Sequence, residues 1–171
     1  LFTLFVENVS LFSQFYIIMH LNRNKAVMKD CAQQVQYTRN EEMLHAQVGI
    51  KLIQTLREEY PELFDKELED RIKHECIESL KAESKVIDWI MDGHTAPGLS
   101  ADILKSFIAK RMADSMDMIG IDNSEIVYDE GHIKETFWFD EELFGANMTD
   151  FFQKRPVEYA KGKGISADDL F

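Results

Sequence analysis

Two glutamates and one histidine stand where a helical protein is expected to place apolar side chains. Glu42 and His45 form a Glu-x-x-His pair, so on an α-helix they project together from adjacent turns. Glu7 lies within the apolar run Leu1–Leu21, where burial of its carboxylate would be costly without a cation. Carboxylates with an imidazole suit Fe or Mn, and di-metal carboxylate bundles take one Glu from each of two helices and Glu-x-x-His from each of two others. The three residues would therefore be half of such a site.

An ordinary structural role accounts for the same three residues. Glu7 would then pair with a Lys or Arg in the core, and His45 would be a hydrogen-bonded interior histidine. Because surface ion pairs often have the Glu-x-x-His spacing as well, the spacing alone favours neither interpretation.

Helices must hold these side chains in place. Apolar residues recur every three or four positions, which predicts helices over residues 1–21, 25–59, 64–91 and 100–119, then short helices and loops over 121–152. The helix over 64–91 presents a mostly charged, solvated face. On the second helix one stripe contains Val35, Thr38, Glu42, His45, Gly49 and Leu52. Glu41 is rotated about 100° from that stripe, so Glu42 is the better candidate ligand. We expect surface or capping roles for the other histidines, which are His20, His74, His94 and His132.

Composition places limits on the partners. The chain has 171 residues, about one domain, and a net charge of −12 from 19 basic and 31 acidic residues. Such acidity disfavours binding to nucleic acid or to an anionic membrane surface. The two cysteines form no disulfide framework, and no signal peptide is evident, so we expect a cytoplasmic protein. Because the chain starts at Leu1 inside an apolar helical run, we also expect a fragment or one piece of a split protein.

Several segments carry a family pattern in order along the chain. Val6–Phe15 is a Val-Glu pair followed by an aromatic-rich, Ser-containing helix, and about 35 residues after Glu7 comes Arg39–His45, with its Glu-x-x-His. Asp150–Tyr159 is followed by the closing segment Asp168–Phe171, which is acidic and ends in Phe. Together these segments resemble the C-terminal portion of the radical-generating small (beta) subunit of class I ribonucleotide reductase.

The resemblance implies an all-α, ferritin-like helical bundle with a dinuclear Fe or Mn centre. Glu7, Glu42 and His45 would be metal ligands, and the remaining ligands would belong to helices preceding Leu1. Glu41 stands where the family carries an Asp beside the ligand, and would support the ligand histidine by hydrogen bonding. This departure leaves open whether Glu41 rather than Glu42 faces the metal.

The resemblance also assigns the C-terminal residues. Residues 1–152 would belong to the bundle, and 153–171 would be a flexible tail. Tyr159 would relay the radical to the large subunit, on which Asp168, Asp169, Leu170 and Phe171 would dock. The implied activity is that of a ribonucleoside-diphosphate reductase, with a dimeric small-subunit assembly and a further chain or segment that supplies the missing ligands. Two alternatives remain, a different di-metal oxidase or oxygenase on the same bundle and a non-enzymatic helical interaction module.

Overall fold

The computed structural model describes residues 3–147, and this part of the chain is helical with no strand. A π-helical segment comes first, followed by five α-helices and one short 3₁₀ turn. In chain order the elements are η1 (Thr3–Ser10), α1 (Leu11–Lys25), α2 (Lys29–Glu59), η2 (Pro61–Leu63), α3 (Lys66–Met91), α4 (Ala101–Met118) and α5 (Glu130–Asn147).

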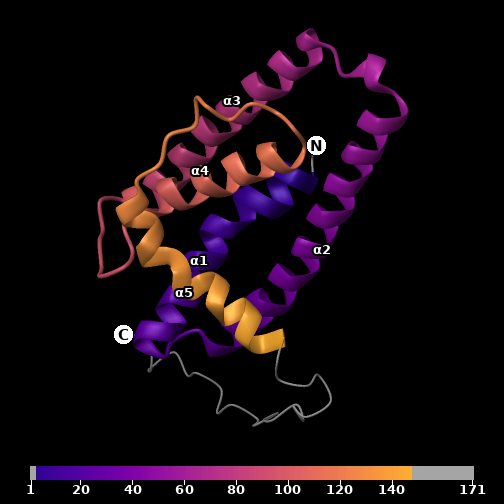
Figure 1. Cartoon of the computed structure of the whole chain (residues 1–171). Coiled ribbons are helices and arrows are strands. Elements are labelled where there is room, and N and C mark those ends of the chain that lie inside the picture. Colours follow the sequence, from indigo (N-terminus) through magenta and orange to yellow (C-terminus); the bar gives the residue numbers. More distant parts are fainter. Residues whose placement is uncertain (1–2, 148–171) are drawn as a thin grey trace.

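The first two elements form the centre of the arrangement. η1 continues into α1 as one rod, and the rod lies between α2 and α4 (Figure 1). α3 and α5 both pack against α4, while α2 and α3 meet through η2 at one end of the molecule. By length and composition alone, Leu4–Lys25 could cross a membrane, the one such helix among residues 3–147. In this structure the buried side chains of this helix form part of the hydrophobic core, together with residues of α3, α4 and α5.

Aromatic side chains fill the core where α1, α4 and α5 converge. Phe12, Tyr16 and Phe139 are almost fully buried, and Phe107 packs edge-on against Phe139 at 5.4 Å between ring centroids. The Tyr16 hydroxyl donates to the Gly98 carbonyl at 2.9 Å, and burial raises the pKa of Tyr16 to about 12. The core therefore fixes α5 against the rod.

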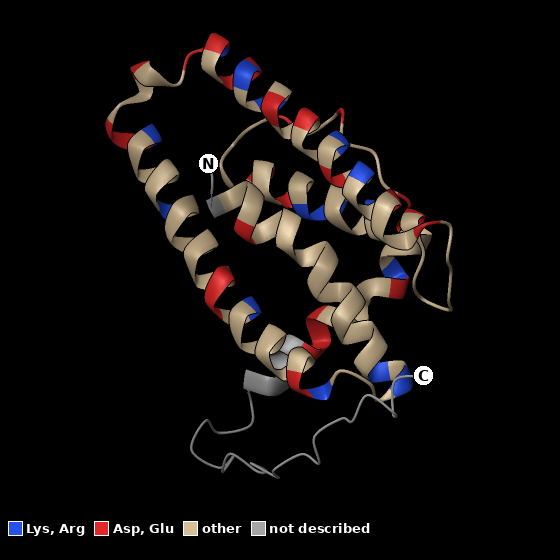
Figure 2. Cartoon of the chain, turned by 180° about the vertical axis from the view of Figure 1, so that it is seen from behind, with Lys and Arg blue, Asp and Glu red and all other residues tan. Residues whose placement is uncertain are grey.

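The predicted helices are confirmed in number and order up to residue 119, with local differences. Residues 22–24, between the first two predicted helices, lie inside α1, and the chain turns instead at Ala26 and Met28, which have φ of 53° and 57°. Residues 130–147 form one helix rather than short pieces. Charged side chains line α3 on its outer side, as predicted (Figure 2), but Glu83 is buried.

Candidate metal centre

Glu7, Glu42 and His45 come together between η1 and α2. His45 Nδ1 lies 3.0 Å from Oε2 of Glu42 and 3.7 Å from Oε2 of Glu7. One potential ligand atom from each residue falls within 4.8 Å of the others. The predicted i, i+3 pair on α2 thus meets the carboxylate of the neighbouring rod, because η1 packs closely along α2.

The surroundings of these side chains differ on the two sides of the site. Glu7 and Glu42 are 18% and 16% exposed, whereas His45 is 56% exposed. Oε2 of Glu7 is buried, and no hydrogen-bond donor within residues 3–147 satisfies it. Leaving a buried carboxylate oxygen without a partner is costly. The site is therefore enclosed on its carboxylate side and open beside His45.

A divalent metal ion fits this arrangement better than a structural ion pair does. In the described part of the chain, neither Glu7 nor Glu42 forms an ion pair with Lys or Arg; their only cationic partner is His45, if protonated. Two carboxylates so close together are stabilised by a cation between them. Two carboxylate oxygens with one imidazole nitrogen form a donor set typical of Fe and Mn sites.

Glu41 lies apart from this group. Its side chain is exposed and does not belong to the cluster formed by Glu7, Glu42 and His45. The structure therefore brings Glu42, rather than Glu41, beside Glu7. The supporting role expected of Glu41 stays a prediction.

Buried polar contacts that the sequence reasoning missed hold the two ligand-bearing elements. On α2, the fully buried guanidinium of Arg39 donates through Nη1 to the Phe139 carbonyl at 2.9 Å and lies 4.7 Å from the Phe139 ring centroid. Burial lowers the pKa of Arg39. On α1, Ser13 donates to the buried carboxylate of Glu83 at 2.6 Å. These contacts join residues that are 70 and 100 positions apart in the sequence, so the helical repeat could not predict them.

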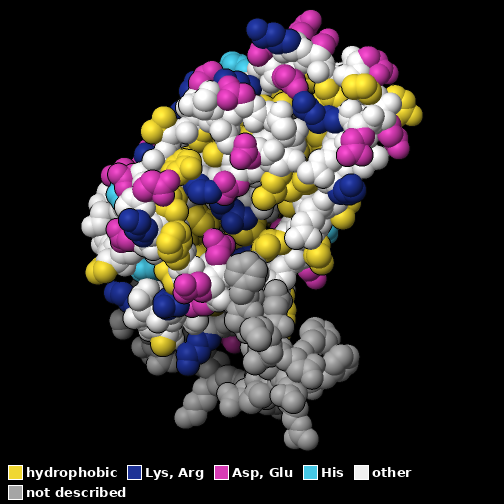
Figure 3. Space-filling model, viewed as in Figure 1, with side chains coloured by type: hydrophobic (Ala, Val, Ile, Leu, Met, Phe, Trp, Pro, Cys, Tyr) yellow, Lys and Arg dark blue, Asp and Glu magenta, His cyan; other side chains and the backbone are white. Residues whose placement is uncertain are grey.

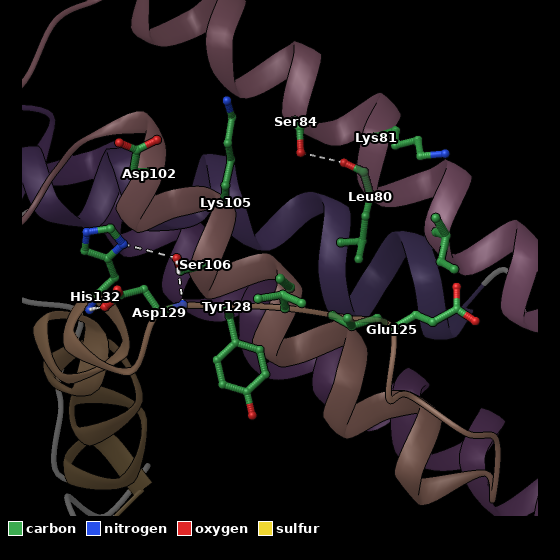
Figure 4. Close-up of a pocket in the computed structure, with 14 residues that line it drawn as sticks. Leu80, Lys81, Ser84, Asp102, Lys105, Ser106, Glu125, Tyr128, Asp129 and His132 are labelled. Carbon is green, nitrogen blue, oxygen red and sulfur yellow. Dashed lines mark hydrogen bonds between the residues drawn. The ribbon is translucent and has the colours of Figure 1, made fainter.

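The other histidines lie outside the described metal-ligating group. His20 is buried, contrary to the surface or capping role expected of it, and its Nε2 lies 2.9 Å from the Pro97 carbonyl. His132 borders a separate pocket of about 560 Å³ between α3, α4 and the segment leading into α5. There its Nδ1 lies 3.2 Å from Ser106 Oγ, which also accepts from the Asp129 backbone N–H (Figure 4). Glu7, Glu42 and His45 do not line this pocket, so it is separate from the candidate metal centre.

The predicted tail residues are not among the described residues. Tyr159, Asp168, Asp169, Leu170 and Phe171 all fall within 148–171, so their expected roles stay predictions.

Comparison with known proteins finds the same family that the sequence motifs resemble. A family model described as "Ribonucleotide reductase, small chain" matches residues 1–129, a range that includes all three clustered residues. The chain is 27% identical over 162 residues to a probable ribonucleoside-diphosphate reductase small subunit of Invertebrate iridescent virus 3, covering 94% of this chain and 42% of that protein. It is 27% identical over 173 residues to a ribonucleoside-diphosphate reductase subunit beta of Treponema pallidum (strain Nichols), covering 96% and 46%. The chain thus spans less than half the length of these relatives.

Proposed function

Because the chain belongs to the ribonucleotide reductase small-chain family, we propose that Glu7, Glu42 and His45 help to hold the dinuclear Fe or Mn centre of such a reductase. One observation carries the proposal. The carboxylates converge on His45 within 4.8 Å, and a buried oxygen of Glu7 has no hydrogen-bond donor in the described part of the chain.

Glu7, Glu42 and His45 each contribute one ligand group to the proposed centre. When bound, the metal pair supplies a one-electron oxidising equivalent that the large subunit uses to reduce ribonucleotides to deoxyribonucleotides. Glu7 and Glu42 offer carboxylate oxygens from two different elements, and His45 offers an imidazole nitrogen. The burial of the carboxylates limits water on that side of the site, which strengthens their interaction with a cation.

The remaining ligands must come from elsewhere, because three donors are too few for two metal ions. We propose that a second chain or a further segment supplies helices with the other carboxylates and the second Glu-x-x-His. The open side of the site supports this. On the side of α2 that carries His45, Val48 and Leu52 follow three and seven positions later and are 69% and 59% exposed. Apolar side chains are visible along the edge where α2 lies (Figure 3).

The partners and setting of the protein are part of the same proposal. Tyr159 relays the radical to the large subunit, and residues 168–171 dock on that subunit. The small subunit works as a dimeric assembly in the cytoplasm, where its product supplies DNA replication. Membership of the family supports the large-subunit partner, and the motifs of the C-terminal segment support the roles of the tail residues.

Metal binding by neighbouring glutamate variants tests the ligand assignment. The full chain is titrated with Mn²⁺, and the loss of the free Mn²⁺ signal is followed by electron paramagnetic resonance. We expect Glu42→Gln to weaken binding strongly, because it removes a carboxylate ligand. Glu41→Gln is the matched control, since it removes the same charge one position along the helix. An equal loss in both variants would contradict the assignment, as would absence of binding by the folded wild-type chain in the presence of the chain or segment that supplies the remaining ligands.

The tail assignment needs a different experiment. Reductase activity is measured with the large subunit and the chain or segment that supplies the remaining ligands. Removal of residues 167–171 is expected to abolish activity while metal content stays the same. Full reductase activity without these residues would contradict the docking role of the tail. Absence of reductase activity from the intact, metal-loaded assembly would favour a different di-metal oxidase or oxygenase, and absence of Fe and Mn from the folded assembly would favour an interaction module.

A further inference from the structure

Glu7 lies in a π-helical segment, a rare form of helix that occurs frequently at functional sites. η1 covers Thr3–Ser10 and changes to α-helical spacing at Leu11. π-helical turns carry i→i+5 hydrogen bonds in place of the i→i+4 bonds of an α-helix. Where i→i+5 spacing changes to i→i+4 spacing, one carbonyl oxygen near the junction is left without a helical donor. Such a segment needs support from outside the helix.

Arg111 of α4 provides a donor to this segment. Its Nε donates to the backbone carbonyl of Asn8 at 2.7 Å, and its Nη2 donates to the side-chain Oδ1 of Asn8 at 2.7 Å. The side-chain Nδ2 of Asn8 in turn donates to Ser115 Oγ at 2.7 Å. One turn of α4 therefore binds the residue next to Glu7 through its backbone and through both polar atoms of its side chain.

Arg111 is itself fixed in position. Its guanidinium carbon lies 3.6 Å from the centroid of the Phe12 ring, and Nη1 lies 3.8 Å from a carboxylate oxygen of Asp140. The side chain is only 15% exposed. Burial lowers the pKa of Arg111 to about 10, so the guanidinium stays protonated at neutral pH. Its planar fork then offers donors in a rigid arrangement.

We propose that Arg111 is a positioning residue for the metal ligand Glu7 and acts through Asn8. By binding the Asn8 carbonyl, it stabilises the π-helical register of η1. If η1 changed to α-helical spacing, its residues would shift by one position relative to α1, which is a rotation of roughly 100°. Glu7 would then face away from Glu42 and His45. This inference rests on the proposed metal-binding role of Glu7.

A pair of arginine variants tests the inference in the full chain. Arg111→Met removes both hydrogen bonds to Asn8. Arg57→Met is the matched control, because Arg57 also bonds a carboxylate (Glu69, 2.6 Å) and lies 4.9 Å from an aromatic ring centroid (Phe64). Mn²⁺ affinity is measured by electron paramagnetic resonance, and the visible absorption of bound Co²⁺ reports the ligand geometry.

We expect Arg111→Met to weaken Mn²⁺ binding about tenfold, the lower end of the effect of removing an outer contact at a metal site. The Co²⁺ spectrum should change at unchanged helicity by circular dichroism. Arg57→Met should alter neither, and Arg111→Lys, which keeps a cationic donor, should restore part of the affinity. Wild-type affinity and an unchanged spectrum in folded Arg111→Met would overturn the proposal.

Two further measurements cover the remaining cases. If Arg111→Met does not fold, Arg111→Lys tests the same link: its single ammonium group cannot reproduce the planar fork, so weaker binding than in wild type is expected and wild-type binding would be contrary to the proposal. If the wild-type chain binds no Mn²⁺ even together with the chain or segment that supplies the remaining ligands, the proposed function fails by itself. Hydrogen exchange at the amides of residues 6–10 then tests the positioning role, because Arg111→Lys should speed their exchange and unchanged rates would contradict it.

Discussion

Replacement of Phe139 by alanine tests how far α5 supports the rest of the bundle. The Phe139 ring is fully buried, and the guanidinium carbon of Arg39 lies 4.7 Å from its centroid. Four aromatic rings lie around it at 5.4–6.1 Å between centroids, those of Phe12, Tyr16, Phe107 and Trp138. The substitution would leave a cavity at the point where α1, α4 and α5 meet.

The expected loss of stability is large. Phe-to-Ala substitutions in cores cost about 3–5 kcal/mol, and each aromatic pair adds about 0.5–1.5 kcal/mol beyond area burial. With four ring neighbours, Phe139→Ala belongs at the upper end of that range, about 4–5 kcal/mol. A domain is stable by only about 5–15 kcal/mol in total, so this variant should be close to unfolding.

Urea unfolding followed by circular dichroism measures this loss. Phe137→Ala is the control, because Phe137 lies two residues away on the same helix and is 52% exposed. The control should change the free energy of unfolding by less than about 0.5 kcal/mol, as is usual for surface substitutions. A loss below about 1 kcal/mol for Phe139→Ala, or similar losses in both variants, would refute the role assigned to this ring.

Two further predictions concern titratable side chains. Burial raises the pKa of Cys76 to about 12, whereas Cys31 is exposed. An aromatic disulfide reagent should therefore label Cys31 in the folded chain and Cys76 only on unfolding. Rapid labelling of both thiols in the folded chain would contradict this prediction. The hydrogen bond from Lys73 lowers the pKa of Asp122 from 3.8 to about 2, so the pair contributes stability above pH 3.8 that is lost as the pH falls towards 2. The urea concentration at the midpoint of unfolding should therefore be lower for Asp122→Asn than for wild type at pH 6, and the two should match at pH 2. An equal difference between the midpoints at both pH values would contradict a stabilising Lys73–Asp122 pair.

The helices and the ligand cluster could be predicted because they depend on local spacing. Glu42 and His45 are three residues apart, and their juxtaposition follows from the helical repeat alone. The approach of Glu7 to them depends on how η1 packs on α2, and for this the family pattern, rather than spacing, provided the expectation. The site was therefore predicted from two different sources.

The features that were missed have no local signal. Phe137, Trp138 and Phe139 are consecutive, so the helical spacing of apolar residues in α5 cannot be recognised from the sequence, although only Phe139 is fully buried. Ala26 and Met28 adopt left-handed conformations without the glycine that usually marks them. The contact of Arg111 with Asn8 spans 103 positions, and neither residue type indicates it in advance.

The turn at Ala26 and Met28 makes the two ligand-bearing elements the arms of a helical hairpin. At a rise of about 1.5 Å per residue, Glu7 lies roughly 28 Å before Ala26 and Glu42 roughly 21 Å after Met28. A change of about 5° in the angle between the arms would move their ends by about 2 Å, whereas metal–ligand distances tolerate only about 0.2 Å. A small change of the angle at the turn therefore displaces Glu7 relative to Glu42 by about ten times the variation that a metal–ligand distance tolerates, so the conformation of Ala26 and Met28 controls the geometry of the distant site.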